Sequence, residues 1–505
     1  MYKLLLCWRY LCTRYIALAS IISVTLGVAT MIVVNSVMAG FTHEMQDRLH
    51  GILSDVVVEC VSLSGFSSDP DRLMAEIREV VGDDLEAMTP TVHVPAMLSY
   101  EVRGRWITKQ VNLIGIDAAT HAQVGDFGKY LLHPENRRQT SFQLREDGYD
   151  DRIAESGWGY RRKRIALERA MQAERDALAP SDVGPSDEGD STDVANPFAQ
   201  QRPETPQDTF DEMTQHHSGV VLGMAVASVR HRDQSGQVKD YFFCRPGDDV
   251  KITFPTAGTP PKAATGTFTA VDLYESKMSE YDSSFVFVPI ETLQKLRGMF
   301  DPQTGVYSVN SIQLKLKEGV NLNQVRDRLR QRFPADQFPY HIQTWRDMQG
   351  PLLAAVQMET TILNILLFLI IAVAGFGILA TFFMIVVEKT RDVGILKSLG
   401  APSGGIMNIF LGYGLSLGTV GSGVGMVLGL LFVANINLIA AVLESITGHE
   451  VFDQTVYYFQ EIPTVIRPFT IGWIVGGAMI IAVLASVLPA IRASRLHPVE
   501  ALRYE

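Results

Sequence analysis

Four segments of the chain carry no charged residue for longer than the roughly 20 apolar residues that an α-helix needs to cross a bilayer. The third segment is too long for one crossing, and we expect it to leave the hydrocarbon near Asn435 and Asn437. The first is longer than the apolar core of a cleaved signal peptide, so we expect it to be retained. The sequence therefore predicts four transmembrane helices, with both chain ends on one side. The segments are Tyr15–Thr42, Thr360–Val387, Ser398–Leu443 and Pro468–Ile491.

The rest of the chain is too polar to lie in a membrane. Of the 505 residues, 47% are hydrophobic but 20% are charged, more than a bundle of spanning helices alone would carry. The net charge is -11, and Pro180–Glu212 contributes -8 of it through nine acidic residues and one basic residue. Because no basic patch is interleaved with aromatic residues, nucleic acid is not an expected partner.

Lysine and arginine gather at the same ends of the four segments, which marks the cytoplasmic side. The short loop at the opposite end, Glu444–Arg467, has one arginine against four acidic residues. The large region His43–Glu359 is therefore expected outside the cytoplasm. The basic residues are Lys3, Arg9, Arg14, Lys389, Arg391, Lys397, Arg492, Arg495 and Arg503.

The large outer region has the pattern of a compact α+β domain. Runs such as Ser54–Cys60 and Lys109–Ile116 combine β-branched residues with alternation and predict strands, whereas Asp69–Val81 and Asn321–Phe333 have helical spacing behind a capping residue. Between about residues 134 and 218 the pattern fails, because too little apolar surface is available to offset the ordering entropy. We expect a largely disordered acidic insertion there, with an interaction tail as the alternative.

The fold class expected is thus a membrane α-helical protein with four transmembrane helices and a large extracytoplasmic α+β domain. The expected division is a cytoplasmic segment at 1–14, helix 1 at 15–42, the periplasmic domain at 43–355, helix 2 at 356–388, a short cytoplasmic helix at 389–401, helix 3 at 402–434, a periplasmic loop at 435–467, helix 4 at 468–491 and a cytoplasmic tail at 492–505.

Five glycines in the third segment are spaced 4, 3, 4 and 4 residues apart, which places them on one helix face. Small residues on one face let another helix approach closely within lipid. The letters Gly-Leu-Ser-Leu-Gly at the start of this row also match a nucleophile elbow, but that motif needs a strand-to-helix turn with acid and histidine partners. We therefore expect a packing role for Gly414, Gly418, Gly421, Gly425 and Gly429.

The outer region offers no expected metal centre. His216 and His217 are adjacent, but no cysteine or carboxylate accompanies them at ligand spacing. Cys60 and Cys244 could form a disulfide outside the cytoplasm, and the sequence leaves their pairing open.

The sequence Thr344-Trp-Arg-Asp347 has the pattern of a capping box. It predicts that the second spanning helix begins well outside the bilayer. A helix of that length could transmit force as a stiff rod.

The stretch Val387–Pro402 interrupts two apolar segments with charged residues. Thr390–Leu399 is long enough for a short helix, Gly400 suits a left-handed C-terminal cap and Pro402 suits the start of the next helix. By itself the pattern fits an ordinary solvated turn equally well.

This stretch resembles the signature of FtsX/MacB-type ABC transporter permeases, in which it forms the cytoplasmic coupling helix that docks on a separate ATPase. The ending Leu488–Glu505 is also similar to that family, and within it Ser23–Leu49, Glu280–Leu296 and Val456–Pro468 are similar to the lipoprotein-releasing permeases LolC and LolE. The resemblance implies an outer domain of MacB-like type. It implies ATPase-coupling roles for Glu388, Lys389, Arg391, Asp392, Gly394, Leu396, Lys397 and Gly400.

The resemblance also implies the function and the partners. The chain is expected to be a permease, not an enzyme, that pairs with a LolD-like ABC ATPase subunit, which binds ATP and Mg, and with a second permease chain in a homodimer or a LolC/LolE-type heterodimer. The cargo would be a lipoprotein drawn from the bacterial inner membrane and passed to a periplasmic lipoprotein carrier. A hook loop for that carrier would fall at Pro255–Thr267, with Pro255, Pro260 and Pro261 as its candidate residues.

Three functional hypotheses remain open. The first is lipoprotein release by mechanotransmission, and the second is MacB-type export or FtsX-type regulation of a cell-wall hydrolase on the same architecture. The third is a membrane-anchored enzyme or binding module, for which the polar stretch between helices 2 and 3 would be dispensable.

Overall fold

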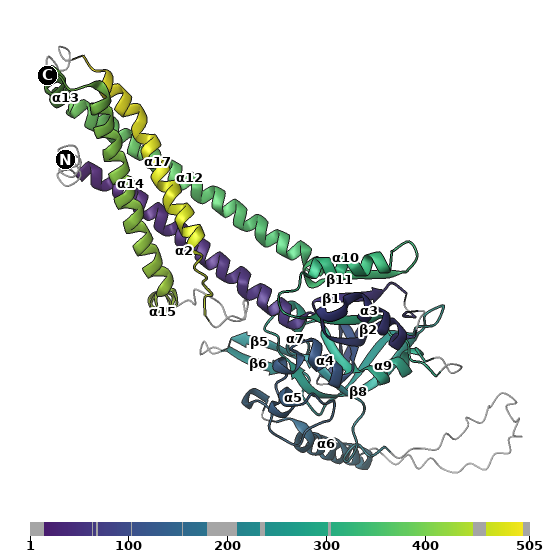
Figure 1. Cartoon of the computed structure of the whole chain (residues 1–505). Coiled ribbons are helices and arrows are strands. Elements are labelled where there is room, and N and C mark those ends of the chain that lie inside the picture. Colours follow the sequence, from purple (N-terminus) through teal and green to yellow (C-terminus); the bar gives the residue numbers. More distant parts are fainter. Residues whose placement is uncertain are drawn as a thin grey trace, which may run out of the picture. The chain divides into compact units, whose positions relative to one another are not determined.

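The computed structural model describes residues 15–62, 64–66, 69–102, 104–153, 155–178, 210–232, 238–300, 305–447 and 461–497. The chain divides into two compact units (Figure 1). Residues 1–47 and 349–505 form one of them, here called the helical unit, and residues 48–348 form the other, here called the sheet domain. The expected cytoplasmic segment 1–14 lies outside the described residues.

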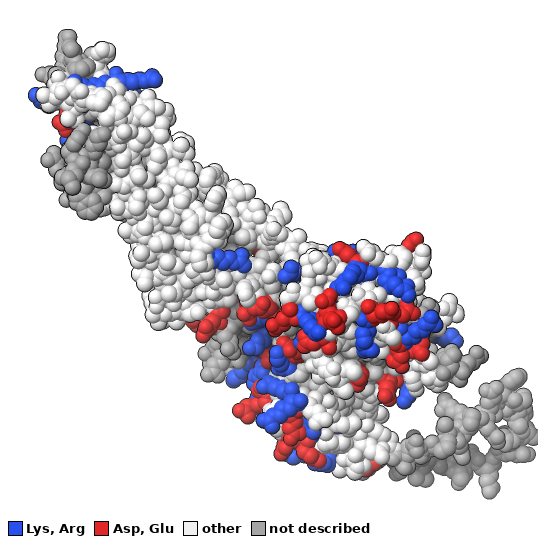
Figure 2. All heavy atoms as spheres, in the orientation of Figure 1, with Lys and Arg blue, Asp and Glu red and all other residues white. Residues whose placement is uncertain are grey.

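Four helices of the described chain are long and apolar enough to cross a membrane. The face visible in Figure 2 is almost free of charged side chains along these helices, with lysine and arginine at the end that carries α13. The expected fold class, a membrane α-helical part with a large α+β domain, is confirmed. The four helices are α2 (Tyr15–Ile52), α12 (Gly350–Glu388), α14 (Ser403–Ala434) and α17 (Pro468–Arg495).

The second spanning helix is much longer than a bilayer requires. With 39 residues, α12 is about 58 Å long at about 1.5 Å per residue, against a hydrocarbon core of about 30 Å. It begins at Gly350, earlier than the expected residue 356.

The capping box lies one element upstream of its expected place. The backbone N–H of Asp347 donates to Thr344 Oγ1 (3.2 Å) and that of Thr344 donates to Asp347 Oδ2 (3.0 Å). This reciprocal pair caps α11 (Trp345–Met348), a single turn after which α12 starts anew. The expectation that it caps the long helix was wrong, because the helix is broken at Gln349.

The expected periplasmic loop at 435–467 contains a further helix, α15 (Ile436–Thr447). The third spanning helix ends at Ala434, and Asn435 occupies its C-cap, where the two asparagines predicted the exit from the hydrocarbon. Residues 448–460 lie outside the described residues.

The sheet domain is built on nine strands in the order β11-β1-β10-β2-β3-β9-β4-β8-β7. The long strand β2 pairs with β10 through its first half and with β7 through Met97–Ser99. The sheet thus closes on itself, and β2, β3, β9, β4, β8 and β7 form a six-stranded barrel from which β10, β1 and β11 extend. The strands are β1 (Val56–Cys60), β2 (Leu85–Val102), β3 (Arg105–Ile116), β4 (Gly219–Gly223), β7 (Asp249–Pro255), β8 (Ala263–Tyr274), β9 (Phe285–Pro289), β10 (Ser311–Leu316) and β11 (Tyr340–Thr344).

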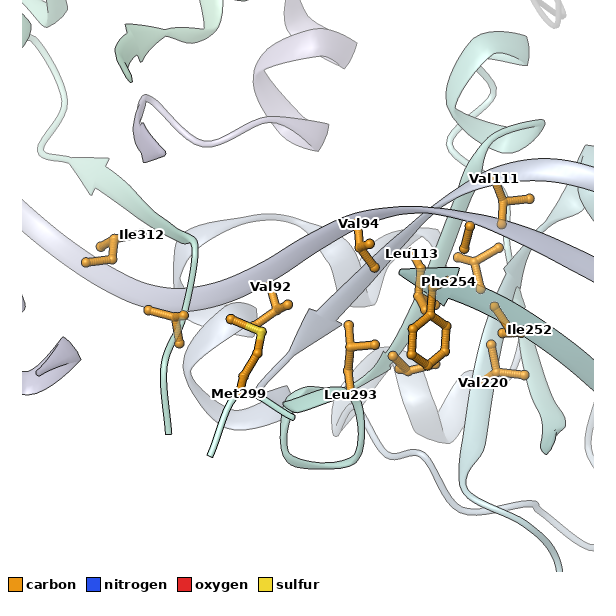
Figure 3. Packing of buried hydrophobic residues seen from close by; sticks show 14 of the residues in the cluster. Val92, Val94, Val111, Leu113, Val220, Ile252, Phe254, Leu293, Met299 and Ile312 are labelled. Carbon is orange, nitrogen blue, oxygen red and sulfur yellow. The ribbon is translucent and has the colours of Figure 1, made fainter. Parts of the chain in front are cut away.

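Alternate residues of these strands fill the barrel. Val94, Val111, Leu113, Val220 and Ile252 point into one apolar cluster, which Figure 3 shows together with Leu293, Met299 and Ile312. Fully burying a side chain of this size stabilises the folded state by about 1.5–3 kcal/mol. The remaining elements are α3 (Pro70–Val81), η1 (Gly82–Asp84), α4 (Ala118–Val124), η2 (Phe127–Tyr130), α7 (Met224–Ala227), the hairpin of β5 (Ser228–Arg232) and β6 (Val238–Phe242), α8 (Ser279–Asp282), α9 (Ile290–Arg297) and α10 (Leu322–Arg332).

The expectation of a largely disordered insertion from about 134 to 218 was wrong for its described parts. Residues 134–153, 155–178 and 210–218 include α5 (Pro134–Arg138), η3 (Asp151–Ile153) and α6 (Gly157–Leu178). They are held to the barrel by isolated apolar anchors and by buried charge, neither of which gives a periodic pattern. Leu144, Ile153 and Ile165 are buried, as is Arg161, which pairs with Asp249 of β7. Residues 179–209 lie outside the described residues.

Candidate functional site

The polar stretch between the second and third spanning helices folds as a separate helix, α13 (Thr390–Ser398). Its end is fixed by Gly400, whose φ of +91° favours glycine. The N–H of Gly400 donates to Lys397 O and that of Ala401 to Leu396 O, both at 3.0 Å, which together form a Schellman motif. The predicted left-handed cap is therefore present, and Pro402 occupies the N-cap of α14.

One face of α13 is packed into the helical unit. Thr390, Val393 and Gly394 are buried, and Val393 belongs to the apolar cluster formed by the spanning helices. Thr390 Oγ1 donates to Val386 O at 2.9 Å, which ties the first turn of α13 to the last turn of α12. The helix is therefore seated on the bundle and is not a free solvated turn.

The opposite face of α13 is exposed and partly apolar. Arg391, Ile395 and Leu399 recur at four-residue spacing, and Ile395 and Leu399 are 43% and 80% exposed. Exposed aliphatic side chains beside charged ones on a short helix are typical of a protein-binding surface. We call these three residues the α13 outer face.

Lys397 belongs to neither face, because its ammonium group is directed into the protein. Its Nζ donates to the carbonyl oxygens of Ser494 and Leu496, at 2.7 Å each. Both carbonyls are at the C-terminal end of α17, where the helix dipole and unpaired carbonyls favour a cation. Lys397 thereby joins α13 to the fourth spanning helix.

The predicted coupling residues thus fall into three groups. Glu388 and Arg391 are exposed and Gly400 forms the exposed cap. Lys389, Asp392, Leu396 and Lys397 are half-buried, and Lys389 Nζ pairs with Asp392 Oδ2 at 2.8 Å. Gly394 is buried, so it does not form part of the exposed face of α13. The expected coupling residues did not include Ile395 and Leu399, which the four-residue spacing of apolar residues within a polar stretch could have identified.

The glycine row of α14 lies against two other helices. A Cβ at Gly414 or Gly418 would come within 2.5 Å of Ser486 Oγ or 2.9 Å of Ala482 Cβ, both on α17. A Cβ on Gly421, Gly425 or Gly429 would come within 3.0, 2.7 and 3.2 Å of Val24, Thr25 and Ala29, all on α2. The row therefore permits close contact on both sides, and a continuous packed path runs from α13 through α17 and α14 to α2.

The predicted hook loop is the hairpin that joins β7 to β8. Pro255 ends β7 and is half-buried, whereas Pro260 and Pro261 are exposed at the tip. The loop is closed by the N–H of Thr256 donating to Lys262 O (2.8 Å), and it is tied to α9 by the N–H of Ala257 donating to Arg297 O (2.9 Å). A groove of about 370 Å³ lies beside its base, lined by Pro95, Ala96, Met97, Gln110, Thr253, Phe254, Pro255, Pro261, Lys262 and Ala263.

The residues that resemble a nucleophile elbow, a metal site or a disulfide in the sequence have structural roles. Ser416 lies inside α14 and donates to Tyr413 O at 2.8 Å, as a hydroxyl in a spanning helix commonly does. His217 stacks on Phe210 with ring centroids 4.3 Å apart. Cys60 and Cys244 are buried free thiols, and among the described residues no group of three or more His, Cys, Asp and Glu could hold a metal ion.

Residues 364–498, which contain α13 and most of its supports, match the family described as FtsX-like permease C-terminal. The chain is 32% identical over 262 residues to the lipoprotein-releasing system transmembrane protein LolC of Xylella fastidiosa strain 9a5c, a match that covers 51% of this chain and 61% of that protein. It is 27% identical over 223 residues to LolE of Haemophilus influenzae, covering 44% of this chain and 52% of that protein. The chain thus spans about three fifths of the length of the first of these curated relatives.

Among solved structures, the periplasmic region of MacB from Actinobacillus actinomycetemcomitans aligns with 60% of this chain and 95% of its own length, at 11% identity and a TM-score of 0.23. The FtsX-like permease domain and the four apolar helices together describe a multi-pass membrane protein.

Proposed function

We propose, from the FtsX-like permease domain at residues 364–498, that this chain is the permease subunit of an ATP-driven ABC transporter that extracts lipoproteins from the inner membrane. The sheet domain lies on the periplasmic side, and the extracted lipoprotein passes to a periplasmic carrier. The similarity to LolC and LolE proteins supports the choice of cargo.

The observation that carries the proposal is the combination of an exposed outer face and a buried inner face on α13. Ile395 and Leu399 present apolar surface on the side where lysine and arginine indicate cytoplasm, while Val393 and Lys397 anchor the helix to the bundle. A force applied at the outer face is therefore passed on to the spanning helices and not absorbed by a flexible turn.

Extraction of a lipid anchor requires an outside source of energy. Each CH₂ group withdrawn from the bilayer costs about 0.8 kcal/mol, so several acyl chains cannot be released into water at a useful rate. ATP hydrolysis by a separate LolD-like subunit, which binds ATP and Mg²⁺, supplies the energy in this proposal. A second permease chain, identical or paralogous, completes the transporter.

The carrier engages the β7–β8 hairpin in this proposal. Pro260 and Pro261 lie at its exposed tip, and the hydrogen bonds to Arg297 hold the loop in one position on the barrel. A fixed protrusion loses little conformational entropy on binding.

The test compares Ile395→Asp with Leu167→Asp, a substitution at a leucine of α6 that is 60% exposed. Each variant is purified from its native membrane in mild detergent, and the co-purifying ATPase, the second permease chain and lipoprotein-stimulated ATP hydrolysis are measured. We expect Ile395→Asp to weaken ATPase binding at least about tenfold and Leu167→Asp to leave it unchanged.

Two other outcomes would contradict all or part of the proposed function. Absence of any nucleotide-hydrolysing companion in the wild-type preparation would contradict the proposal. Stimulation by peptides, drugs or a cell-wall hydrolase, but not by lipoproteins, would keep the transporter architecture and replace the cargo.

A further inference from the structure

The chain enters the sheet domain at the end of α2 and leaves it through α11, and both crossings meet at Asp55. The Asp55 side chain is only 7% exposed, and its Oδ1 accepts a hydrogen bond from His50 Nε2 at 2.8 Å, on the last turns of α2. Its Oδ2 accepts one from the backbone N–H of Leu316 at 2.8 Å, at the end of β10. Its backbone carbonyl accepts a third from the N–H of Trp345 at 3.2 Å, the first residue of α11.

Packing joins the same residues a second time. Trp345 is 4% exposed, and its ring lies 5.9 Å from the His50 ring. Immediately after Asp55, Val56 pairs with Leu314 of β10 on one side and with Thr344 of β11 on the other. The end of the incoming helix and the start of the outgoing helix are thus held by one residue in the sheet. We call His50, Asp55 and Trp345 the clasp.

The outgoing crossing, α11, is also held to the sheet domain by contacts with α10. Asp347 is the second residue of the capping box of α11. Its carboxylate accepts a bifurcated hydrogen bond from Arg326 Nη1 of α10, at 2.9 Å to each oxygen. Arg330 of α10 donates to the carbonyl oxygen of Ile342 in β11. A movement of α11 is therefore passed directly to the sheet.

The carboxylate at the centre of the clasp pairs with two groups. It accepts at both oxygens at once, from His50 on one and from the Leu316 amide on the other. Alanine at this position has no side-chain group that could pair with either His50 or the Leu316 amide. The geometry alone therefore predicts which substitution separates the two crossings.

We propose that Asp55 is a positioning residue that locks the last turns of α2 and the single turn of α11 together, so that the two crossings of the sheet domain move as one. This proposal rests on the proposed function only for its consequence, which is that the two crossings pass work to the cargo-handling domain together and not separately. The lock itself is a property of the sheet domain.

Hydrogen exchange of the full-length chain in lipid nanodiscs tests the lock. In Asp55→Ala we expect peptides that contain the Leu316 amide and peptides that contain the Trp345 amide to exchange about ten- to hundredfold faster, because both hydrogen bonds to the carboxylate are lost. His50→Ala, at a side chain that is 56% exposed, should leave the fold intact and accelerate the Trp345 peptide as well. Acceleration confined to the Leu316 peptide in both variants would overturn the proposal.

The control is His43→Ala. His43 is also on α2, is 54% exposed and pairs with Asp47 at 2.7 Å, so this substitution removes a similar histidine–aspartate contact on the same helix without changing the clasp. Faster exchange of the Trp345 peptide in this control would show that any loosening of α2 has the effect, and would also overturn the proposal.

The consequence is tested separately in the reconstituted transporter with a purified lipoprotein. Asp55→Ala and His50→Ala should keep basal ATP hydrolysis within about twofold of wild type while lipoprotein release slows about tenfold or more. A merely structural defect would lower both together. If no ATPase accompanies the chain, the proposed function fails and the exchange experiment still decides the clasp.

Discussion

Lys397 on α13 donates a hydrogen bond to the carbonyl oxygen of Ser494, 97 positions later in the chain, at 2.7 Å. The same ammonium group reaches the carbonyl of Leu496, so one side chain caps the C-terminal end of α17. The last turn of α17 and the last turn of α13 are therefore joined directly by this side chain.

If the proposed function holds, replacing Lys397 with methionine should lower lipoprotein-stimulated ATP hydrolysis without releasing the ATPase subunit. Methionine keeps the apolar stem but leaves two carbonyls at the end of α17 unpaired, and a hydrogen bond to a charged group contributes about 1.5–3 kcal/mol. We expect the ATPase to co-purify normally, because the α13 outer face is unchanged, while lipoprotein-stimulated hydrolysis falls about tenfold. The measurement is the ratio of stimulated to basal ATPase rates in proteoliposomes.

Lys397→Arg serves as the control for that substitution. Arginine keeps the charge and can reach both carbonyls, so it should restore most of the stimulated rate. Equal loss in the methionine and arginine variants would show that the ammonium group is not what joins α13 to α17.

The glycine row of α14 supplies a matched pair of substitutions. A Cβ at Gly425 would lie 2.7 Å from Thr25 O and 2.9 Å from Val28 Cβ, whereas one at Gly423 would have no neighbour within 4 Å. Gly425→Ala should destabilise the bundle by about 1–3 kcal/mol through overpacking against α2. Gly423→Ala should be neutral, or stabilising by up to about 1 kcal/mol, because alanine is the better helix former. Thermal unfolding in a mild detergent, followed by tryptophan fluorescence, separates the two, and equal midpoints would contradict the packing role.

Hydropathy identified the spanning helices because lipid imposes the same requirement on each of them: a long uncharged run and internally satisfied backbone groups. The cap at Gly400 was also predictable, since only a local backbone conformation was involved. The closure of the barrel through β2 and β7 was not, because the pairing of Met97 with Thr253 depends on register between strands far apart in the sequence. Charge patterning likewise did not reveal that Lys397 points inward, because its partners are backbone carbonyls.

The described helices of the insertion were missed for a related reason. Its anchors are single contacts over long separations, and Arg161 with its carboxylate partner Asp249 is the clearest case. In sequence, the four consecutive basic residues Arg161–Arg164 look like a solvent-exposed turn of a helix. Only the fold shows that the first of them is fully buried.

Arg161→Met should therefore release α6 from the barrel. Arg161 donates to Asp249 Oδ1 (2.7 Å), to Gly247 O (3.0 Å) and to Glu212 O (3.1 Å), and its side chain is fully buried. Removing one partner of a buried ion pair costs about 3–5 kcal/mol, and somewhat less here because Asp249 is 24% exposed and keeps its bond from Thr269. We expect limited trypsin digestion to cut within α6 at least about tenfold faster.

The neighbouring Arg162→Met provides the comparison. Arg162 pairs with Glu146 on the surface, where solvent screens the interaction, so digestion of α6 should proceed at the wild-type rate apart from loss of that one cleavage site. Faster digestion in both variants would mean that helix charge, and not the buried contact, keeps α6 in place.

Asp272 of β8 should make the stability of the sheet domain depend on pH. Its carboxylate accepts hydrogen bonds from Asn136 Nδ2 (2.8 Å), from the N–H of Leu273 (2.8 Å) and from the N–H of His133 (3.2 Å). Desolvation by burial outweighs these bonds and raises the pKa of Asp272 from 3.8 to about 6. The folded domain thus binds this proton more tightly than the unfolded chain does. The resulting stabilisation is complete below pH 3.8 and is lost as the pH rises through about 6.

The shift of roughly two units corresponds to about 3 kcal/mol between these limits. Asp272→Asn cannot titrate, so the unfolding midpoint of the wild type should rise relative to that of the variant as the pH falls from about 7 to about 4. Thermal unfolding of both proteins in the same detergent across this range measures the difference. Midpoints that run parallel at every pH would mean that the carboxyl group has the same pKa in the folded and unfolded chains. In that case the hydrogen bonds from Asn136, Leu273 and His133 compensate for the desolvation of the Asp272 carboxylate. Asp272 then holds the segment of His133 and Asn136 to β8 equally well at about pH 4 and about pH 7.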